Sequence, residues 1–132
     1  MSSVFSKIVS GDIPSYKIAE NDEFLAFLDL RPLKKGHTLV IPKVEIDYFF
    51  DVPDDLLGRH MQFAKKVAGA IEKVIECKRI GVSVIGLEIP HAHIHLIPID
   101  SVTDMDFTRM PLDLSAEEMQ AISESIGEAM EY

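Results

Sequence analysis

Basic residues, cysteine and long apolar runs are all scarce in this sequence. Its 13 Lys and Arg stand against 22 Asp and Glu, and the formal net charge of −9 argues against binding to a nucleic-acid polymer or to anionic lipid. The single cysteine, Cys77, excludes an internal disulfide and a cysteine-rich zinc site. No stretch approaches the roughly 18 apolar residues of a membrane span, and the first residues lack the apolar core of a secretory signal. We therefore expect a cytoplasmic protein without nucleic-acid or membrane partners.

The length of the chain and the order of its expected elements indicate the fold class. A chain of 132 residues suits a single domain, 1–132, because two separate cores of half this size would each be marginal. Strands are expected at 16–20, 24–30, 37–42, 79–85 and 89–99, a short helical turn at 4–9, a long amphipathic helix at 54–77, and a last helix opened by the capping box of Ser115 and Glu118. Strands that cluster before and after one long helix are typical of an α+β fold. We predict a mainly antiparallel sheet of about five strands with one long helix and a C-terminal helix.

Three of the five histidines occupy a stretch of five residues. His91, His93 and His95 alternate with apolar residues, and in a strand this period of two sends the three imidazoles to one face and the apolar side chains to the other. The apolar face can then pack beneath the long helix, while the histidines face solvent or a cleft. A lone histidine such as His60, on the apolar stripe of that helix, is more simply a hydrogen-bonded core residue.

Three kinds of site are compatible with such a row of histidines. Zinc holds nitrogen ligands at about 2.0–2.1 Å, whereas same-face positions two apart on a strand are about 6.6–6.8 Å apart, so two of the histidines can share an ion and all three hardly can. Metal binding therefore requires a further ligand, with His37 and Glu45 as candidates. In phosphoryl or nucleotidyl transfer, neighbouring imidazoles can attack, donate hydrogen bonds and carry protons. We rank phosphate chemistry above metal binding, and both above a row of histidines without a chemical role.

The run His91-x-His93-x-His95, followed by two hydrophobic residues, resembles the signature of the histidine triad (HIT) nucleotide hydrolases and transferases, and of their Hint-like branch in particular. Other stretches are similar to family segments in the same order, namely the N-terminal segment at 5–14, the nucleoside-binding strand at 24–32 and the strand with the fourth histidine at 36–43. The resemblance covers most of residues 4–99 and implies a HIT-like fold.

The resemblance assigns a role to four histidines. It implies that His93 attacks the α-phosphorus of a nucleotide to form a covalent nucleotidyl-histidine, from which water releases a nucleoside monophosphate. His95 is implied to contact the phosphate, and His91 and His37 to support the site. An imidazole with an ordinary pKa of about 6.5 is substantially neutral at neutral pH, as a nucleophile must be. No metal or cofactor is expected.

The resemblance also implies a nucleoside site and a homodimer. Asp29 matches the family's acid that accepts hydrogen bonds from ribose hydroxyls, although a turn former at a strand end is the simpler interpretation of an isolated aspartate. An apolar slot for the base, most often a purine, is implied to be lined by Val4, Phe5, Ile8, Leu28 and Leu30. Relatives usually dimerise around the long helix, and the broad apolar face of residues 56–75 favours a homodimer here.

Several positions depart from the family pattern. Ser3 and Ser6 stand where some relatives carry zinc-binding cysteines, and Glu45 stands where a histidine is frequent, so that zinc site is expected to be absent. Glu88 replaces the usual hydroxyl donor just before the triad. A carboxylate there repels phosphate unless it is protonated, turned away or paired with a cationic leaving group. Glu88 is therefore a candidate substrate contact or a structural residue outside the site.

These features predict a nucleotide hydrolase that cleaves a phosphoramidate or related nucleotidyl bond of a purine nucleotide. Three alternatives stay open: a dinucleoside polyphosphate hydrolase, a nucleotide-binding regulatory module with weak or lost catalysis, and a metal-dependent hydrolase that uses two triad histidines with His37. The acidic charge balance does not exclude a nucleotide, because imidazoles and backbone N–H groups can hold it locally, whereas a long polyanion requires an extended basic surface.

Overall fold

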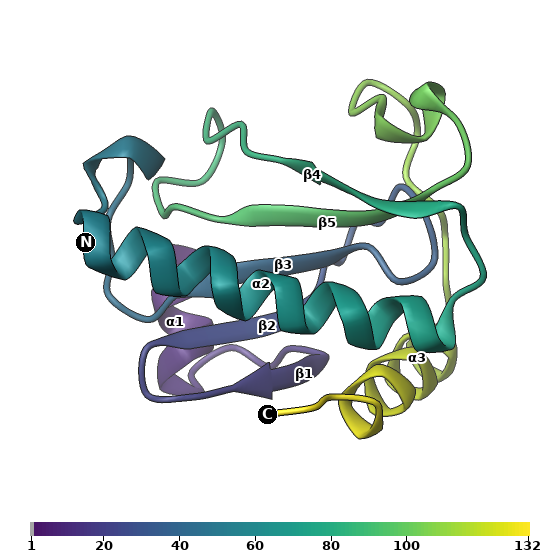
Figure 1. The fold of residues 1–132 in the computed structure, drawn as a ribbon, viewed down its shortest axis with the longest axis horizontal. Coiled ribbons are helices and arrows are strands. Elements are labelled where there is room, and N and C mark those ends of the chain that lie inside the picture. Colours follow the sequence, from purple (N-terminus) through teal and green to yellow (C-terminus); the bar gives the residue numbers. More distant parts are fainter. Residues whose placement is uncertain (1) are drawn as a thin grey trace.

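The computed structural model describes residues 2–132 and has a five-stranded antiparallel sheet at its centre (Figure 1). The strand order is β1-β2-β3-β5-β4. The strands are β1 (Lys17–Glu20), β2 (Phe24–Leu28), β3 (Thr38–Pro42), β4 (Arg79–Ser83) and β5 (Ile94–Ile99), the helices are α1 (Val4–Ser10), α2 (Asp54–Val74) and α3 (Ala116–Glu128), and two 3₁₀ turns are η1 (Phe49–Asp51) and η2 (Val102–Met105). The predicted α+β class, with a long helix and a C-terminal helix, is confirmed.

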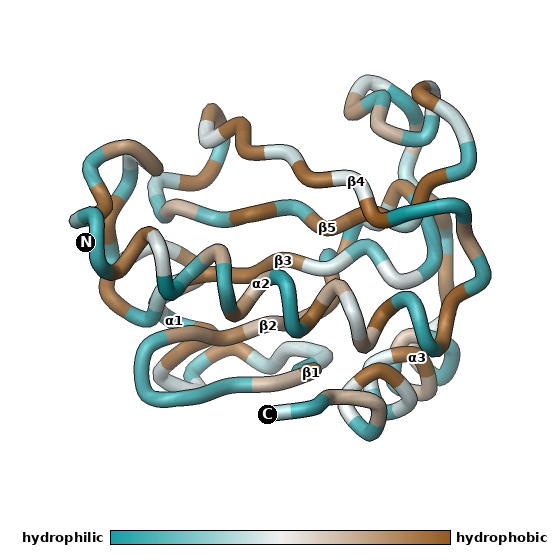
Figure 2. The backbone as a smooth tube through the Cα atoms, in the orientation of Figure 1, coloured by the Kyte–Doolittle hydropathy of each residue, from teal (hydrophilic) through white to brown (hydrophobic). Residues whose placement is uncertain are grey.

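Helix α2 lies across one face of the sheet and covers it with an apolar stripe. Asp54 and Asp55 occupy its first turn, where they complement the partial positive charge of the helix N-terminus. Hydrophobic and hydrophilic segments alternate along α2, and the central strands β3 and β5 are mostly hydrophobic (Figure 2). The main core therefore lies between α2 and the sheet. Within residues 2–132 no helix is both long and apolar enough to cross a bilayer.

His60 is a core residue of α2, which confirms the prediction for this histidine. Its side chain is fully buried. The Nε2–H group donates a hydrogen bond to the Val40 carbonyl of β3 at 2.8 Å, and the ring stacks on Phe24 with centroids 5.2 Å apart. His60 therefore joins α2 to the sheet and takes no part in the cavity described below.

Strand β2 is buried on both faces, because a second, smaller core lies on the side of the sheet away from α2. Leu28 packs in the α2 core, whereas Phe27 joins Phe5 of α1 in the second core. The prediction that Leu28 lines a slot beside α1 is therefore wrong. Alternation along the strand places Phe27 on the α1 side instead.

The histidine segment is less regular than predicted. Strand β5 begins after His93, so that only His95 of the three histidines lies in a strand, and His91 and His93 precede it. The backbone N–H of Ala92 donates to the carbonyl of Ile46 in a loop. The backbone N–H of Ala92 thus bonds to a loop and not to a neighbouring strand, so the regular ladder does not include this part of the segment.

Two other element ends also differ from the prediction. Helix α2 ends at Val74 because Ile75 takes an extended backbone conformation. Pro98, where a bend or an end was expected, lies inside β5. The pairing of β5 with β3 stops at Leu96, so Pro98 lies where β5 pairs with β4 alone, and the missing N–H of proline is tolerated there.

Candidate active site

A cavity of about 500 Å³ lies on the side of the sheet where α1 packs. Its volume is within the range of about 300–1,000 Å³ that is typical of small-molecule sites. Its wall contains residues of α1, Phe27 and Leu39 of the sheet, parts of the segments 29–33, 85–89 and 107–111, and the side chains of His37, His93 and His95. The cavity therefore brings chain segments that are far apart in the sequence together around the imidazoles of His37, His93 and His95.

His93 has one ring nitrogen held and the other free. Its Nδ1–H donates a hydrogen bond to the backbone carbonyl of His91 at 2.7 Å. A carbonyl oxygen only accepts, so the proton is on Nδ1 and Nε2 carries a lone pair. Phe5 packs edge-on against this ring, with centroids 5.0 Å apart. His93 therefore presents an unprotonated nitrogen in the wall of the cavity, as a nucleophile requires.

His95 has the opposite tautomer, which a backbone group sets through His37. The N–H of Leu33 donates to His37 Nδ1 at 3.0 Å, so the proton of His37 must be on Nε2. This Nε2–H lies 2.9 Å from His95 Nδ1 and donates to it. The proton of His95 is therefore on Nε2, which makes His95 a hydrogen-bond donor beside the lone pair of His93.

Burial keeps His37 and His95, the hydrogen-bonded pair here named the histidine relay, neutral. Desolvation lowers the pKa of His37 to about 4, against a smaller opposing effect of the Asp29 carboxylate. Desolvation, reinforced by His37 and His93, lowers the pKa of His95 to about 3. Both imidazoles are therefore uncharged at neutral pH, and the tautomers set by hydrogen bonding persist there.

His91 lies behind the cavity and not in its wall. It is fully buried. Its Nε2–H donates to the carbonyl of Pro42 at 2.7 Å, so its Nδ1 accepts from the hydroxyl of Ser3 at 2.8 Å. Burial lowers the pKa of this ring. His91 contributes to the site through its backbone carbonyl, which accepts the hydrogen bond from His93 Nδ1.

Asp29 follows strand β2 and fits both interpretations of the sequence. Its Oδ1 accepts a hydrogen bond from the backbone N–H of Arg31 at 2.9 Å, as in an Asx-turn. Its Oδ2 lies 3.5 Å from His37 Nε2, and the side chain, 20% exposed, contributes to the wall of the cavity. Asp29 therefore forms the turn and offers an acceptor to a ligand.

Asp29, His37 and His95 place ligand atoms within 4.8 Å of one another, a spacing that suits a metal ion. The chemistry of the donors does not fit one. Because Leu33 N–H points at His37 Nδ1, a neutral His37 carries its proton on Nε2, the atom that would have to bind the metal. The predicted alternative of two triad histidines with His37 is not met among residues 2–132, because the group of ligand atoms that lie within 4.8 Å of one another around His37 contains only His95 of the triad.

The apolar wall of the cavity contains most of the predicted slot residues. Val4, Phe5, Ile8 and Leu30 line it, and Leu28 does not. Phe27 and Leu39 line it as well and were missed. The period of two along each strand is the signal that would have found Phe27, because Leu25 and Phe27 share a face while Leu28 faces α2.

Glu88 lies in the cavity wall, which decides between its two interpretations in favour of the site. It belongs to an exposed loop whose neighbour, Leu87, is 88% exposed. Two cationic side chains, Arg31 and Arg109, also contribute to the wall. The rim of the cavity thus carries charges of both signs around its histidines.

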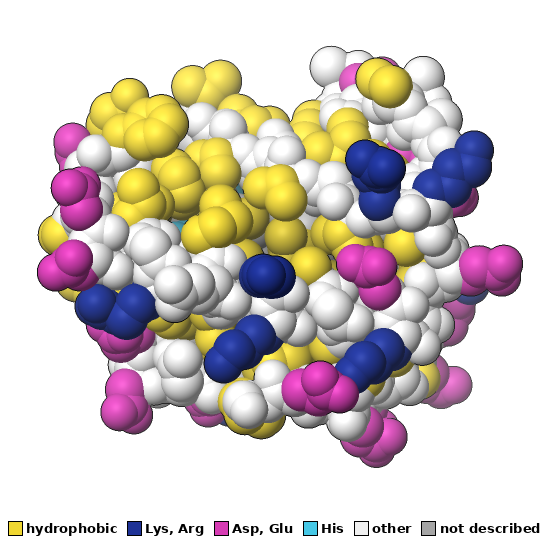
Figure 3. Space-filling view, viewed as in Figure 1, with side chains coloured by type: hydrophobic (Ala, Val, Ile, Leu, Met, Phe, Trp, Pro, Cys, Tyr) yellow, Lys and Arg dark blue, Asp and Glu magenta, His cyan; other side chains and the backbone are white. Residues whose placement is uncertain are grey.

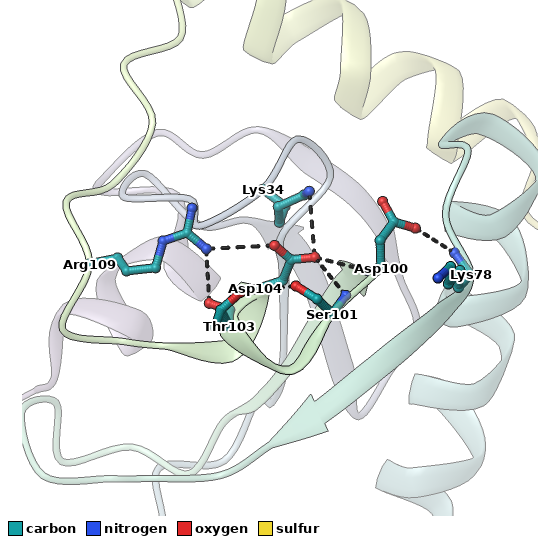
Figure 4. Close-up of polar contacts among 7 residues, drawn as sticks. All are labelled: Lys34, Lys78, Asp100, Ser101, Thr103, Asp104 and Arg109. Atoms are coloured by element: carbon teal, nitrogen blue, oxygen red, sulfur yellow. Dashed lines mark hydrogen bonds and ion pairs between the residues drawn. The ribbon is translucent and has the colours of Figure 1, made fainter.

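A segment after β5 forms the remaining wall and was not expected from the sequence. Asp104 accepts hydrogen bonds from the backbone N–H groups of Asp100 (2.8 Å) and Ser101 (3.2 Å), which fixes the turn at η2. The Asp104 carboxylate also lies 3.6 Å from the Arg109 guanidinium and 3.7 Å from the Lys34 ammonium (Figure 4). The hydrogen bonds from Asp100 and Ser101, with the cations, lower the pKa of Asp104.

The same segment brings Phe107 against the histidine relay. Its ring lies edge-on to His95 with centroids 4.8 Å apart, and 6.2 Å from the ring of His37. Phe107 therefore packs against His37 and His95, whereas Phe5 packs against His91 and His93. An isolated phenylalanine 12 residues beyond the triad gives no pattern from which this contact could be predicted.

Comparison with known proteins identifies the family. The HIT domain model matches residues 10–102, so the chain belongs to the HIT family. An uncharacterized HIT-like protein from Borreliella burgdorferi is 34% identical over 131 residues, which cover 93% of this chain and 94% of the relative. Adenosine 5′-monophosphoramidase hnt1 from Schizosaccharomyces pombe is 40% identical over 100 residues, 74% of each chain. The crystal structure of a Hit-like protein from Bartonella henselae, 26% identical, matches with a TM-score of 0.85 over 98% of this chain and 96% of that one. The predicted family is confirmed.

Proposed function

We propose that this protein is a hydrolase that cleaves a phosphoramidate or related nucleotidyl bond of a purine nucleotide through a covalent intermediate on His93. The observation that carries the proposal is the pair of opposite tautomers: an unprotonated nitrogen on His93 and an N–H on His95, both in the wall of one cavity. A phosphate between them meets a nucleophile and a hydrogen-bond donor. The name of the fission-yeast relative supports the same chemistry.

The reaction proceeds in two steps. In the first, His93 Nε2 attacks the α-phosphorus, the new N–P bond forms, the bond to the leaving group breaks, and the leaving group takes a proton from a water molecule, which becomes hydroxide. In the second, a water molecule attacks the phosphorus and the N–P bond breaks, which releases a nucleoside monophosphate and free imidazole, and the proton that the attacking water loses neutralises the hydroxide. The Nε2–H of His95 donates to a phosphate oxygen throughout, and His37 and His91 hold the two reacting rings in their tautomers.

The walls of the cavity match the parts of a nucleotide. The apolar side chains of α1 and Leu30 face a purine base, and the free acceptor capacity of Asp29 suits a ribose hydroxyl. Glu88 favours an amine over a polyphosphate as leaving group, because a carboxylate attracts a cation and repels further phosphates. This charge is the reason to prefer a phosphoramidate to a dinucleoside polyphosphate.

Incubation with adenosine 5′-phosphoramidate, followed by quantification of AMP, tests the proposal. We expect turnover by the wild-type protein, and none by His93→Ala, which should still bind AMP within a small factor because the base and ribose contacts remain. The matched control is His60→Gln, which changes a histidine outside the cavity. Substantial turnover by His93→Ala would place the nucleophile elsewhere.

Parallel substrates separate the alternatives. A diadenosine polyphosphate assayed at the same concentration distinguishes the polyphosphate hydrolase, and the guanosine phosphoramidate reports base preference. Binding of AMP without turnover of any of these compounds would indicate a nucleotide-binding regulatory module. Turnover that survives thorough chelation is expected, because the donors around His37 do not suit a metal ion.

We also propose that the protein acts as a homodimer in a reducing, cytoplasmic setting. Hydrophobic side chains gather over β4 and the N-terminal part of α2 (Figure 3); the exposed ones include Phe50 (72%), Met61 (45%) and Val82 (52%). Strand β4 is at the edge of the sheet, with only β5 beside it. A second copy that covers this face would bury apolar surface and protect the edge. A monomer mass by light scattering at micromolar concentration would contradict it.

A further inference from the structure

Behind the cavity, four polar side chains from three distant parts of the chain form one hydrogen-bonded group, here named the Glu45 cluster: Ser3, Ser6, Glu45 and His91. One oxygen of Glu45, Oε1, accepts from the backbone N–H of Ser3 and from the hydroxyl of Ser6 at 2.7 Å. These hydrogen bonds lower the pKa of Glu45 to about 2, so the group is an anion at neutral pH. Glu45 thus ties the start of α1 to the loop after β3.

The shortest hydrogen bonds of the cluster have a direction that follows from their partners. The single proton of the Ser3 hydroxyl is donated to His91 Nδ1 at 2.8 Å, because the other ring nitrogen already donates to Pro42. The same hydroxyl oxygen accepts the N–H of Ser6 at 3.0 Å and so caps α1. Removal of the Glu45 carboxylate therefore releases the residue that holds the ring of His91.

The cluster continues directly to the proposed nucleophile. The backbone carbonyl of His91 accepts the Nδ1–H of His93 at 2.7 Å. Phe5, which lies between Ser3 and Ser6 in the sequence, packs edge-on against both rings, with centroids 5.9 Å from His91 and 5.0 Å from His93. One support of His93, the Phe5 ring, thus belongs to α1, and the other, the His91 carbonyl, belongs to a residue whose ring Ser3 contacts.

We propose that Glu45 is a positioning residue for His93. It holds α1 against the segment 91–93 through Ser3 and Ser6, and so keeps His93 Nε2 aimed into the cavity. The inference rests on the proposed function, since it concerns the nucleophile of that reaction. Glu45 itself is outside the cavity wall and touches no substrate. Its effect is on orientation, where small displacements have large consequences for rate.

The chemistry of glutamine provides a conservative variant. Because both hydrogen bonds go to the same oxygen of Glu45, the carbonyl oxygen of Glu45→Gln can accept both without the charge. Glu45→Ala loses both. Asp47→Ala removes an exposed carboxylate two residues further along the same loop and is the matched control.

The test measures kcat and KM with adenosine 5′-phosphoramidate and, in the same samples, the imidazole ¹⁵N resonances of His91 and His93. For Glu45→Ala we expect kcat to fall between about tenfold and 10²-fold with KM nearly unchanged, and both histidine resonances to shift. Glu45→Gln should recover most of the wild-type kcat, and Asp47→Ala should match the wild type. A wild-type kcat with unmoved resonances in Glu45→Ala overturns the inference.

Two further outcomes remain decisive. If Glu45→Ala does not fold, Ser6→Ala removes the hydroxyl contact to Glu45 together with the longer contacts of the same hydroxyl to Ser3 (3.4 Å) and to His91 Nδ1 (3.5 Å). It should lower kcat by a smaller factor with a shift of the His93 resonance, and no change in either overturns the inference. If the wild-type protein turns over no substrate, the proposed function fails, but the resonances still decide the positioning role. A shift of His93 in Glu45→Ala then supports it, and unmoved resonances overturn it.

Discussion

His93 and His95 lie two residues apart, yet their surroundings give them opposite tautomers. The carbonyl of His91 takes the Nδ1 proton of His93. The N–H of Leu33, acting through His37, leaves His95 with its proton on Nε2. In both cases the determining group is a backbone atom, whose hydrogen-bonding role does not change with pH. The backbone therefore places a ring nitrogen with a lone pair on His93 beside an N–H donor on His95.

The tautomers are a prediction that can be measured without any substrate. Long-range ¹H–¹⁵N correlation at pH 7 should show His93 alone with its proton on Nδ1, and the other four histidines with theirs on Nε2. The spectrum of His93→Ala identifies the unusual signal by its loss. An Nε2–H form of His93 would contradict the arrangement.

At the scale of single residues, the sequence motif predicted which histidines matter but not what each does. The spacing of His93 and His95 brings both to the cavity. His91 fits the same motif, yet it is buried and acts through its backbone. Phe107 was missed because its contact with His95 depends on the path of the chain after β5.

Strand β2 and the turn that follows it contribute to both the α2 core and the cavity, and they provide a second prediction. Leu30, two residues beyond β2, is 66% exposed and lines the cavity, so Leu30→Ala should weaken AMP binding by about 1 kcal/mol, several-fold in Kd, with the unfolding midpoint unchanged. The control, Leu28→Val, changes a residue of the α2 core. It should lower the free energy of unfolding by about 0.5–1.5 kcal/mol without affecting Kd. Calorimetric titration and urea unfolding measure the two effects. Equal effects of both variants on AMP binding would be evidence against the assignment of faces.

The capping box of α3 provides a third prediction. The hydroxyl of Ser115 accepts the backbone N–H of Glu118 at 3.1 Å, so Ser115→Ala should destabilise the protein by about 1 kcal/mol. Ser125→Ala, at an exposed position of the same helix, should change stability by less than about 0.5 kcal/mol. Urea unfolding measures both. Neither substitution should alter turnover, because α3 contributes nothing to the cavity wall.

At the scale of elements, periodicity and capping signals were sufficient to predict which segments form helices and strands. They did not predict where an element starts when a distant residue determines it. Alternation along 89–99 predicted a single strand. The structure begins β5 only at Ile94, because Ala92 bonds to Ile46, a residue far away in the sequence. A pattern of side chains reports which faces are apolar but does not report the partner of each backbone N–H.

For the whole molecule, burial of neutral histidines predicts how stability depends on pH. Burial lowers the pKa of His37, His60, His91 and His95 in the folded chain. Below about pH 6.5 the unfolded chain binds protons that the folded chain excludes, so stability falls as the pH falls. In this range each such histidine lowers the free energy of unfolding by at most about 1.4 kcal/mol for each pH unit toward acid. The stabilisation is fully present above pH 6.5 and is lost toward pH 4.

Urea unfolding at pH 7, 6 and 5 tests this dependence, and the midpoint should decrease stepwise toward acid. His60→Phe removes one of the four groups and should give a shallower dependence than the wild type. A midpoint that is the same at pH 7 and pH 5 would refute the prediction, since it would mean that these rings are protonated to the same extent before and after unfolding.

The sequence by itself determined the three histidines that line the cavity, His37, His93 and His95, and the class of the fold. The strand and helix periods and the alternation of His91, His93 and His95 are properties of neighbours along the chain, and each predicts local geometry directly. The tertiary structure alone decided the tautomers, the place of Leu28 in the α2 core and the contact of Glu45 with Ser3. The reason is physical: a hydrogen bond depends on the partner that folding brings within about 3 Å, and these partners come from distant parts of the chain.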